Sequence, residues 1–538
     1  MNAEIKYRQI QHDGYGHRDV IKQDISTSWF DLSHSRLMTF DMGELVPMLC
    51  MEIVPGDYVE LNSDILVRLA PLVAPLFHHL KLNTRYYFVP NRIMWNESGA
   101  SFIDFITGGP NGTDTTVHPY IPSATYQEGT LADYLGIPIE TPLQVNALPF
   151  RAYGLIYNEY FRNEDVQTKL TVSTNDDADS TTNTTLQNVN WEDAGDYFVG
   201  AFESLQRGTA VTLPLGTTAP VYGNGKSLGI TDGTTNTGLT FVSGSGVSAY
   251  TGNYNVNLGT ANSGSALSVS KAIGVVQTGE SGLIADLSTA TSATLAQIRN
   301  ASATQMLLEL LQYSGSPYRN YIQAIFGVND YEDSRFQIPE VLGGKTSSVV
   351  VSEVLSTNGA TGGGLAQMGG HGIAPHATDV IKRRFTEHGL LMGLMYIVPE
   401  AIYQEGLHRM FFRETKFDYL TPQLALIGNQ SILNKEIYAA AASPTATFAY
   451  QRRYGEYMTQ PSSVHGDFRS EADTSLEFWH LARDFSSTPS FNSDFLKCDP
   501  DKARIFTSSS TDCVYAQIVH YIKARRPLPK EDVPYKLI

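Results

Sequence analysis

Leu80-Lys-Leu-Asn-Thr-Arg-Tyr-Tyr-Phe-Val89 shows the clearest strand pattern in this sequence. In an extended chain, successive side chains point to opposite faces, so every second residue shares a face. One face would carry Leu80, Leu82, Tyr86 and Phe88. The other would carry Lys81, Asn83 and Arg85. This alternation predicts a β-strand whose aromatic side chains belong to a core rather than to a base-stacking surface.

Other segments with strand character are widely spaced along the chain. Alternation begins near Glu44, and the further candidates are Tyr58–Leu69, Ser347–Leu355, Gly389–Val398 and Cys513–Lys523. In the last of these, the apolar side would carry Val514, Ala516, Ile518 and Ile522. The spacing shows no regular strand–helix–strand alternation, which favours an antiparallel sandwich with long excursions between strands.

The composition suits strands and long loops, and its charge limits the classes of function. The 538 residues include 29 Tyr, 24 Phe and 45 Gly, with 42% hydrophobic and only 17% charged residues. The formal net charge of −17 argues against a nucleic-acid-binding regulator with a uniformly basic face. The net charge does not exclude local contacts with nucleic acid, and Lys523, Arg525 and Arg526 are candidates for such contacts. A solvated face or a salt bridge between subunits would explain the same cluster.

The cysteines and the N-terminus predict a soluble protein made in a cytoplasm. Cys50, Cys498 and Cys513 are too few and too scattered for a disulfide framework or a zinc site, so buried free thiols are expected. The first residues lack the apolar core of a signal peptide. The longest apolar run, near Leu390 to Val398, is far too short to span a membrane.

No candidate motif for catalysis, cofactor binding or metal binding has the residues that its chemistry requires. Gly225-Lys-Ser227 and Gly344-Lys-Thr346 look like ends of phosphate-binding loops, but proline occupies the position where such a loop needs its first glycine. His371 and His376 lie in a glycine-rich stretch that cannot form the helix of a His-Glu-x-x-His site. The sequence therefore predicts no enzyme, no cofactor and no metal.

Thr217–Thr294 differs from the rest of the chain in composition. More than half of it is Gly, Ser, Thr and Asn, which suits either a disordered linker or an exposed loop of short β-structure. Directly after it, the apolar spacing of Leu295–Gln312 predicts a helix. Thr294 is placed to cap that helix, and Gly315 with Pro317 would end it.

A second helix is predicted in Leu148-Pro-Phe-Arg-Ala-Tyr-Gly-Leu-Ile-Tyr-Asn-Glu-Tyr-Phe-Arg162. Its apolar and aromatic residues recur every three to four positions, and proline is tolerated in the first turn. The polar side is marked by Arg151, Asn158, Glu159 and Arg162.

The amino-acid sequence of this helix and the order of other segments resemble the major capsid protein of the Microviridae, the small single-stranded DNA phages. The resemblance is strongest to their gokushovirus-like branch. The matching segments include Ser35–Pro47, Val54–Asp57, Tyr86–Arg92, Gln206–Gly208, Tyr321–Val328, Pro339–Gly344, Gly466–Arg469 and Trp479–Leu481. The resemblance covers most of the chain. It departs from the typical pattern at Leu49–Glu52 and in the tail Arg526–Lys530.

The resemblance implies a mainly β fold, an eight-stranded antiparallel viral jelly roll with long inter-strand insertions that contain short helices. It implies an N-terminal arm at residues 1–30, a first part of the jelly roll at 31–216 and a second part at 295–538. Residues 217–294 would form a surface insertion at the threefold axis, which favours the ordered-loop interpretation and suggests host attachment.

The resemblance also implies a function and a set of partners. Sixty copies would form a T=1 icosahedral shell around circular single-stranded DNA, assembled in the cytoplasm of a bacterial host. The expected partners are a small basic internal DNA-binding protein, a minor pilot protein, an internal scaffolding protein and a receptor on the host surface, without membrane insertion. The alternative is a β-sandwich protein that binds carbohydrate or degrades polysaccharide, with residues 217–294 as its binding loop.

Overall fold

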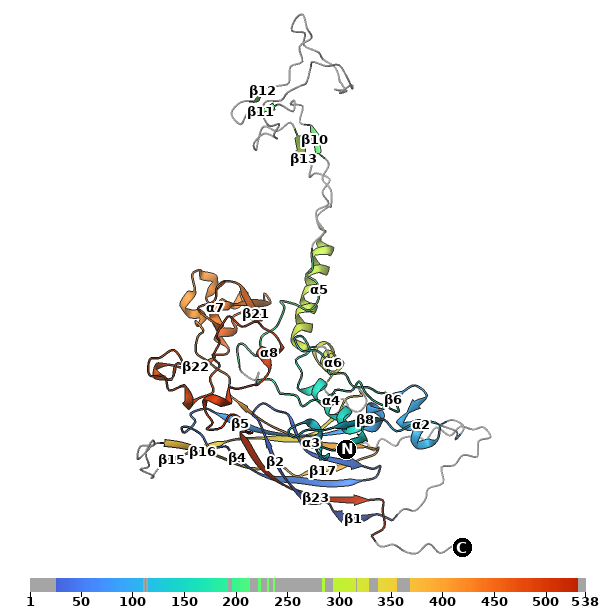
Figure 1. Ribbon diagram of the computed structural model, residues 1–538. Coiled ribbons are helices and arrows are strands. Elements are labelled where there is room, and N and C mark those ends of the chain that lie inside the picture. Colours follow the sequence, from blue (N-terminus) through green and yellow to red (C-terminus); the bar gives the residue numbers. More distant parts are fainter. Residues whose placement is uncertain are drawn as a thin grey trace, which may run out of the picture. The chain divides into compact units, whose positions relative to one another are not determined.

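The computed structural model describes residues 26–109, 112, 115–191, 196–212, 221–223, 230–231, 236–237, 283–285, 294–315, 317–328, 337–355 and 368–530. The chain divides into two compact units. The main unit combines Met1–Leu205 with Leu311–Ile538, and the second unit is Gln206–Leu310. Two large sheets of the main unit are its principal feature (Figure 1).

The first sheet has seven strands in the order β1-β23-β4-β16-β15, with β2 also paired to β23 and β17 to β4. Its strands are β1 (Ser28–Asp31), β2 (His34–Phe40), β4 (Tyr58–Leu69), β15 (Val350–Leu355), β16 (Met368–Ala377), β17 (Ile381–Arg384) and β23 (Val514–Arg526). All of the ladders in this sheet are antiparallel.

The second sheet has four strands in the order β14-β5-β18-β3, also antiparallel. They are β3 (Val46–Ile53), β5 (Leu80–Pro90), β14 (Glu340–Ser348) and β18 (Gly389–Pro399). The two sheets share a pairing rule for the eight strands β2, β3, β4, β5, β14, β16, β18 and β23. In chain order, the first pairs with the eighth, the second with the seventh, the third with the sixth and the fourth with the fifth. The chain therefore follows the path of one long antiparallel hairpin that is folded over on itself.

The main core lies between the inner faces of the two sheets. On β23, the predicted apolar side is buried, with Val514, Ile518 and Ile522 fully enclosed. Their partners from β5 are Leu80, Leu82, Tyr86 and Phe88, which confirms the predicted strand and its apolar face. Intervening residues of β23 such as Tyr515 and Tyr521 are exposed. We call the solvent-exposed side of the first sheet the open face.

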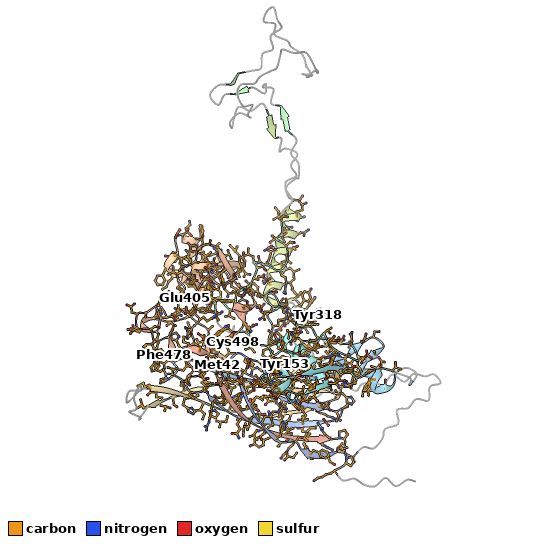
Figure 2. The ribbon with its side chains drawn as sticks, viewed as in Figure 1. Met42, Tyr153, Tyr318, Glu405, Phe478 and Cys498 are labelled. Atoms are coloured by element: carbon orange, nitrogen blue, oxygen red, sulfur yellow. The ribbon has the colours of Figure 1, made fainter. Side chains whose placement is uncertain are left out.

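Strand β18 of the second sheet is buried on both sides, which explains its near-continuous apolar sequence. A second core covers the outer side of the second sheet. It includes helix α4 (Leu148–Tyr160), and Tyr153, in the middle of that helix, is buried in this core (Figure 2). The predicted helix is confirmed, but its polar side does not face solvent. Arg151 and Asn158 are buried, because Arg151 pairs with Asp179 and Asn158 bonds to the backbone of Leu170.

Two features of the sheets differ from the sequence-based expectation, and a third was not predicted. Ser347–Leu355 is not one strand, since the chain leaves the second sheet after β14 and enters the first as β15. Strands begin before Glu44, with β1 and β2. The glycine-rich stretch around His371 is strand β16, where glycine is required because a Cβ at Gly372 would lie 2.4 Å from a Leu69 methyl carbon.

Shorter elements connect the strands of the main unit. Between β5 and β14 lie α1 (Asn91–Met94), β6 (Asn96–Glu97), β7 (Ala100–Ser101), α2 (Phe102–Thr107), β8 (Tyr120–Thr125), α3 (Leu131–Leu135), β9 (Pro142–Asn146) and α6 (Tyr318–Phe326). After β18 lie β19 (Ile402–Tyr403), η2 (Arg409–Phe412), η3 (Lys416–Asp418), η4 (Pro422–Leu424), β20 (Asn429–Leu433), α7 (Asn434–Ile437), β21 (Thr447–Arg452), η5 (Gly455–Tyr457), β22 (Ser462–Ser463), η6 (Gly466–Phe468), η7 (Glu477–Trp479), α8 (Ser493–Leu496) and η8 (Lys502–Arg504). Within the described residues, no helix is long and apolar enough to cross a membrane.

Most of the predicted insertion, 217–294, lies outside the described residues. Its described strands form two short antiparallel ladders, β10 (Val221–Gly223) with β13 (Leu283–Ala285) and β11 (Ile230–Thr231) with β12 (Asn236–Thr237). The helix that follows is α5 (Leu295–Ser314). Its predicted cap is confirmed, since the Thr294 hydroxyl accepts from the Gln297 amide at 3.2 Å and the Gln297 side chain accepts from the Thr294 amide at 2.8 Å.

The three cysteines are free thiols, as predicted. Cys498 is buried (Figure 2) and so is Cys513, while Cys50 is partly buried. Burial raises the pKa of Cys50 to about 11 and raises the pKa values of Cys498 and Cys513 further still. All three are therefore protonated and unreactive at neutral pH.

Candidate functional surfaces

The basic cluster at the end of β23 is divided between the two sides of the first sheet. Lys523 and Arg525 are exposed on the open face. Arg526 points the other way, where its Nε lies 3.3 Å from Oδ2 of the fully buried Asp57 and its Nη2 donates to the Glu52 carbonyl at 2.8 Å. Strand alternation therefore places two of the three predicted residues on one surface and gives the third a structural contact.

A row of four side chains crosses the open face at this end. Strand register places Trp29 of β1 beside Arg525, Arg525 beside Tyr58 of β4, and Tyr58 beside Arg384 of β17. We call these four residues the aromatic–arginine row. Sequence inspection missed it because its members are far apart in the chain and no short motif joins them.

An exposed apolar surface lies on the segment that follows β19. Nine large side chains with substantial exposure form it: Met410, Phe411, Phe417, Tyr419, Leu420, Leu426, Ile427, Tyr457 and Met458. We call this set the apolar lobe surface. Leu426 is 93% exposed, so it contributes nothing to the core of an isolated subunit. Such a concentration of apolar residues is typical of a surface that contacts another protein.

Buried ion pairs lie within the segment that carries the apolar lobe surface. The Arg413 guanidinium contacts Glu456 at 3.3 Å and lies 4.4 Å from the centre of the Tyr457 ring. Arg409 contacts Glu436 at 3.2 Å, and burial raises the pKa of Glu436 although Arg409 opposes the shift. The Tyr454 hydroxyl donates to the Phe417 carbonyl at 3.0 Å. These contacts anchor the segment that carries the exposed side chains.

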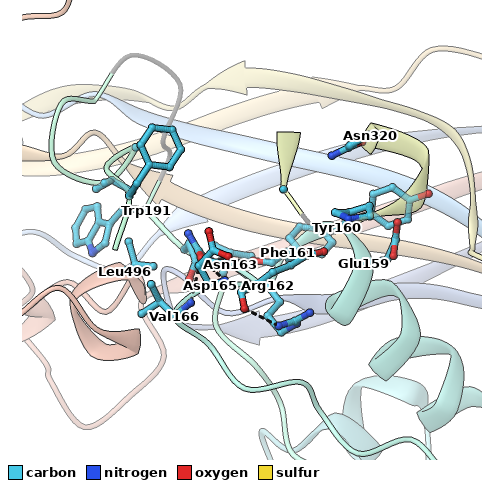
Figure 3. A pocket seen from close by; sticks show the side chains of 18 of the residues that line it. Glu159, Tyr160, Phe161, Arg162, Asn163, Asp165, Val166, Trp191, Asn320 and Leu496 are labelled. Carbon is cyan, nitrogen blue, oxygen red and sulfur yellow. Dashed lines mark hydrogen bonds between the residues drawn. The ribbon is translucent and has the colours of Figure 1, made fainter. Parts of the chain in front are cut away.

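A pocket of about 750 Å³ opens beside the end of α4, lined by segment 159–166 and by Trp191 and Leu496 (Figure 3). Several of its polar groups are bonded within the chain. Arg162 donates to the Gln167 carbonyl at 2.9 Å, and the Gln167 side-chain amide donates to Asn190 at 2.7 Å. The lining offers no convergent set of unused polar groups, so we assign no ligand to this pocket.

The candidate motifs for chemistry do not assemble into sites. His371 and His376 have opposite orientations on β16, and His376 lies between the sheets, bonded to Thr84 at 2.9 Å and Ser347 at 2.7 Å. Gly344-Lys-Thr346 is part of strand β14, while Gly225-Lys-Ser227 lies outside the described residues. Across the described residues, no group of three or more His, Cys, Asp and Glu side chains could hold a metal ion.

Comparison with known proteins finds relatives that match nearly the whole chain. The family model described as "Capsid protein (F protein)" matches residues 19–535. Capsid protein VP1 of Bdellovibrio phage phiMH2K is 33% identical, over 90% of this chain and 91% of the relative. Capsid protein VP1 of Chlamydia phage 1 is 30% identical over 96% of each chain, and that of Spiroplasma virus 4 is 27% identical over 95% of each.

These matches cover nearly the whole chain and come from structural proteins of virus particles. They argue against the carbohydrate-binding or polysaccharide-degrading alternative and indicate a self-assembling, non-enzymatic component of a virion. The chain belongs to the F capsid protein family and is a major capsid protein of the Microviridae type.

Proposed function

We propose that this capsid protein forms a T=1 icosahedral shell around a circular single-stranded DNA genome and that its two sheets are an eight-stranded viral jelly roll. A T=1 shell holds sixty copies by geometry, and closed symmetry lets one pattern of contacts build it. The observation that carries the fold proposal is the pairing of first with eighth, second with seventh, third with sixth and fourth with fifth strand across two sheets.

The apolar lobe surface supplies contact between copies. Each subunit carries a net charge of −17, so identical subunits repel one another at long range. Burial of exposed apolar side chains such as Leu426 and Phe411 offsets this repulsion, at about 25 cal/mol per Å² of apolar area removed from water. The supporting ion pairs keep the surface in one shape before contact, which lowers the entropy cost of association.

The open face of the first sheet faces the genome through Lys523 and Arg525. These two cations cannot neutralise a genome within a shell that is itself strongly negative. Packaging therefore requires a small basic internal DNA-binding protein. A minor pilot protein and an internal scaffolding protein complete the set of partners, and the shell is assembled in the cytoplasm of the bacterial host.

Residues 217–294 form the surface protrusion at the threefold axis and contact a receptor on the host. Two observations support an insertion that leaves and returns at neighbouring points. The Arg207 amide donates to the Leu308 carbonyl at 3.3 Å, and β10 pairs with β13 more than fifty residues further along the chain. Both contacts lie within the second unit, Gln206–Leu310, which clusters separately from the main unit.

Electron microscopy of the purified full-length protein tests the shell. We expect closed isometric particles, together with smaller intermediates on size-exclusion chromatography. A protein that remains a small oligomer under all assembly conditions would contradict the proposal. A protein inventory of particles from infected cells tests the partners, and particles that contain only this chain and DNA would exclude the basic internal protein.

A further inference from the structure

The aromatic–arginine row has a chemistry that the capsid family name does not specify. Its order across four neighbouring strands is Trp29, Arg525, Tyr58, Arg384. Neighbouring strands lie about 4.8 Å apart, so the row spans about 14 Å. We propose that this row binds single-stranded DNA, with unpaired bases stacked on Trp29 and Tyr58 and phosphates held by Arg525 and Arg384. This inference rests on the proposal that the open face meets the genome.

Trp29 is exposed and Tyr58 is partly exposed at the surface of the subunit. Trp29 is 49% exposed, although a tryptophan in a folded subunit is normally enclosed. Its ring meets that of Tyr58 edge to face, with centroids 5.9 Å apart and an angle of 89° between the planes. An edge-to-face contact covers at most one face of one ring, so the contact between the two rings does not prevent a base from stacking on the exposed Trp29.

The two arginines of the row carry charge that the described chain does not neutralise. Arg384 makes no ion pair with any described residue, and Arg525 donates from Nε to the neutral Thr27 hydroxyl at 3.0 Å. The neighbouring pattern is different, since Lys382 on the same face pairs with Glu60 at 3.2 Å. Ion pairing within the described chain therefore does not explain why two arginines alternate with two aromatic rings at this end of the sheet.

Single-stranded nucleic acid is the polyanion that uses both kinds of side chain. Bases in a duplex hide their faces in the stack, whereas unpaired bases offer them to aromatic rings, and arginines track the backbone. The row is built from four neighbouring strands of one sheet, and among the described residues no helix contributes to it, whereas duplex readers insert a helix or a two-stranded ribbon into a groove. Because every base has a stacking face, we expect little dependence on sequence.

Binding of oligonucleotides to unassembled full-length protein tests the row. A fluorescently labelled thymidine oligonucleotide reports affinity by anisotropy, and quenching of tryptophan fluorescence reports stacking on Trp29. We expect Trp29→Leu and Tyr58→Leu each to weaken single-strand binding about tenfold. Arg384→Gln and Arg525→Gln should each reduce the slope of log affinity against log salt by about 0.7.

Two controls on the same face separate this site from general attraction. Arg68→Gln removes an equal charge from β4, ten residues beyond Tyr58, and Tyr521→Leu removes an exposed ring outside the row. Neither should change affinity by more than about twofold. Equal losses in control and row variants, or equal affinity for a duplex of the same length, would overturn the inference. Particle formation is scored separately by microscopy, so failure of DNA binding is distinguishable from failure of the shell.

Discussion

Arg151 and Asp179 form a fully enclosed ion pair, with Nη2 and Oδ2 2.8 Å apart and neither side chain exposed. Arg151 also donates to the carbonyls of Met94 and Asn175, at 3.1 and 2.8 Å. Asp179 accepts from Thr182 as well. Burial raises the pKa of Asp179, but the hydrogen bonds from Thr182 and the contact with Arg151 outweigh it and hold the pKa below its usual value. One arginine thus joins α4, the segment after β5 and the loop at residue 175.

Breaking this pair should destabilise the subunit strongly. Asp179→Asn leaves the Arg151 charge buried without its partner, which costs about 3–5 kcal/mol. The matched control is Glu387→Gln, because Glu387 contacts Arg92 at 2.6 Å but both side chains are about one-third exposed. That change should cost no more than about 1 kcal/mol. Denaturant unfolding of the two variants compares them directly. Equal midpoints would show that the buried pair stabilises the fold no more than the exposed pair does.

Adjacent arginines at the end of β23 should differ in their effect on stability. Arg526→Gln removes the cation beside the buried Asp57, whose pKa burial already raises, so we expect a loss of about 1–3 kcal/mol. Arg525→Gln should change the free energy of unfolding by less than about 0.5 kcal/mol, because this side chain is exposed. The two variants carry the same charge change. Equal stabilities would show that the inward contact of Arg526 is dispensable.

Mild acid should weaken the contact between the two sheets. His520 of β23 accepts from the Ser63 hydroxyl at Nδ1 and donates from Nε2 to the Met48 carbonyl, so it is neutral. Burial lowers its pKa to about 4, and the nearby His34 and Arg36 side chains add to the shift.

The unfolded chain takes up this proton near pH 6.5, so stability is full above that pH and falls as the pH drops from about 6.5 towards 4. The contribution of His520 to this loss reaches about 3 kcal/mol. Unfolding curves at pH 7 and pH 5 measure it, and His520→Gln should flatten the difference. A wild-type protein that is equally stable at both pH values would contradict the expectation.

The apolar lobe surface should control assembly without affecting the fold. Leu426→Asp adds a charge at a side chain that is almost fully exposed, so the unfolding midpoint should stay within about 0.5 kcal/mol of wild type. If this surface contacts another copy, the buried charge should abolish particle formation in the electron micrograph. Leu426→Gln is the milder companion change and should weaken assembly less. Normal particles from the aspartate variant would exclude Leu426 from the interface.

Replacement of residues 217–294 by a short Gly/Ser linker should leave the main unit folded. The cost of closing a flexible loop grows by only about 0.6 kcal/mol per doubling of its length, so the length of the linker should have little effect on the stability of the main unit. We expect unchanged unfolding of the main unit, weaker assembly and loss of attachment to host cells. Circular dichroism, microscopy and a cell-binding assay measure the three outcomes. A deletion variant that cannot fold would show that this segment belongs to the core.

The sequence alone determined the elements whose pattern is local. Alternation of apolar and polar residues predicted β4, β5 and β23, because one face of each strand must meet a core. The capping residue Thr294 predicted the start of α5, because a helix cap is also a local feature. Thr294 and Gln297 satisfy each other's backbone amides within one turn.

Only the tertiary structure decided what depends on partners far apart in the chain. No local signal shows that Arg151 has Asp179 as its partner or that Arg526 turns inward to Asp57. Nor does one show that β16 requires glycine at position 372 because Leu69 fills the space beside it. The aromatic–arginine row exists only through strand register, which brings Trp29 beside Arg525 across almost five hundred residues. Long-range pairing creates these relationships, so they become visible only when the sheets are assembled.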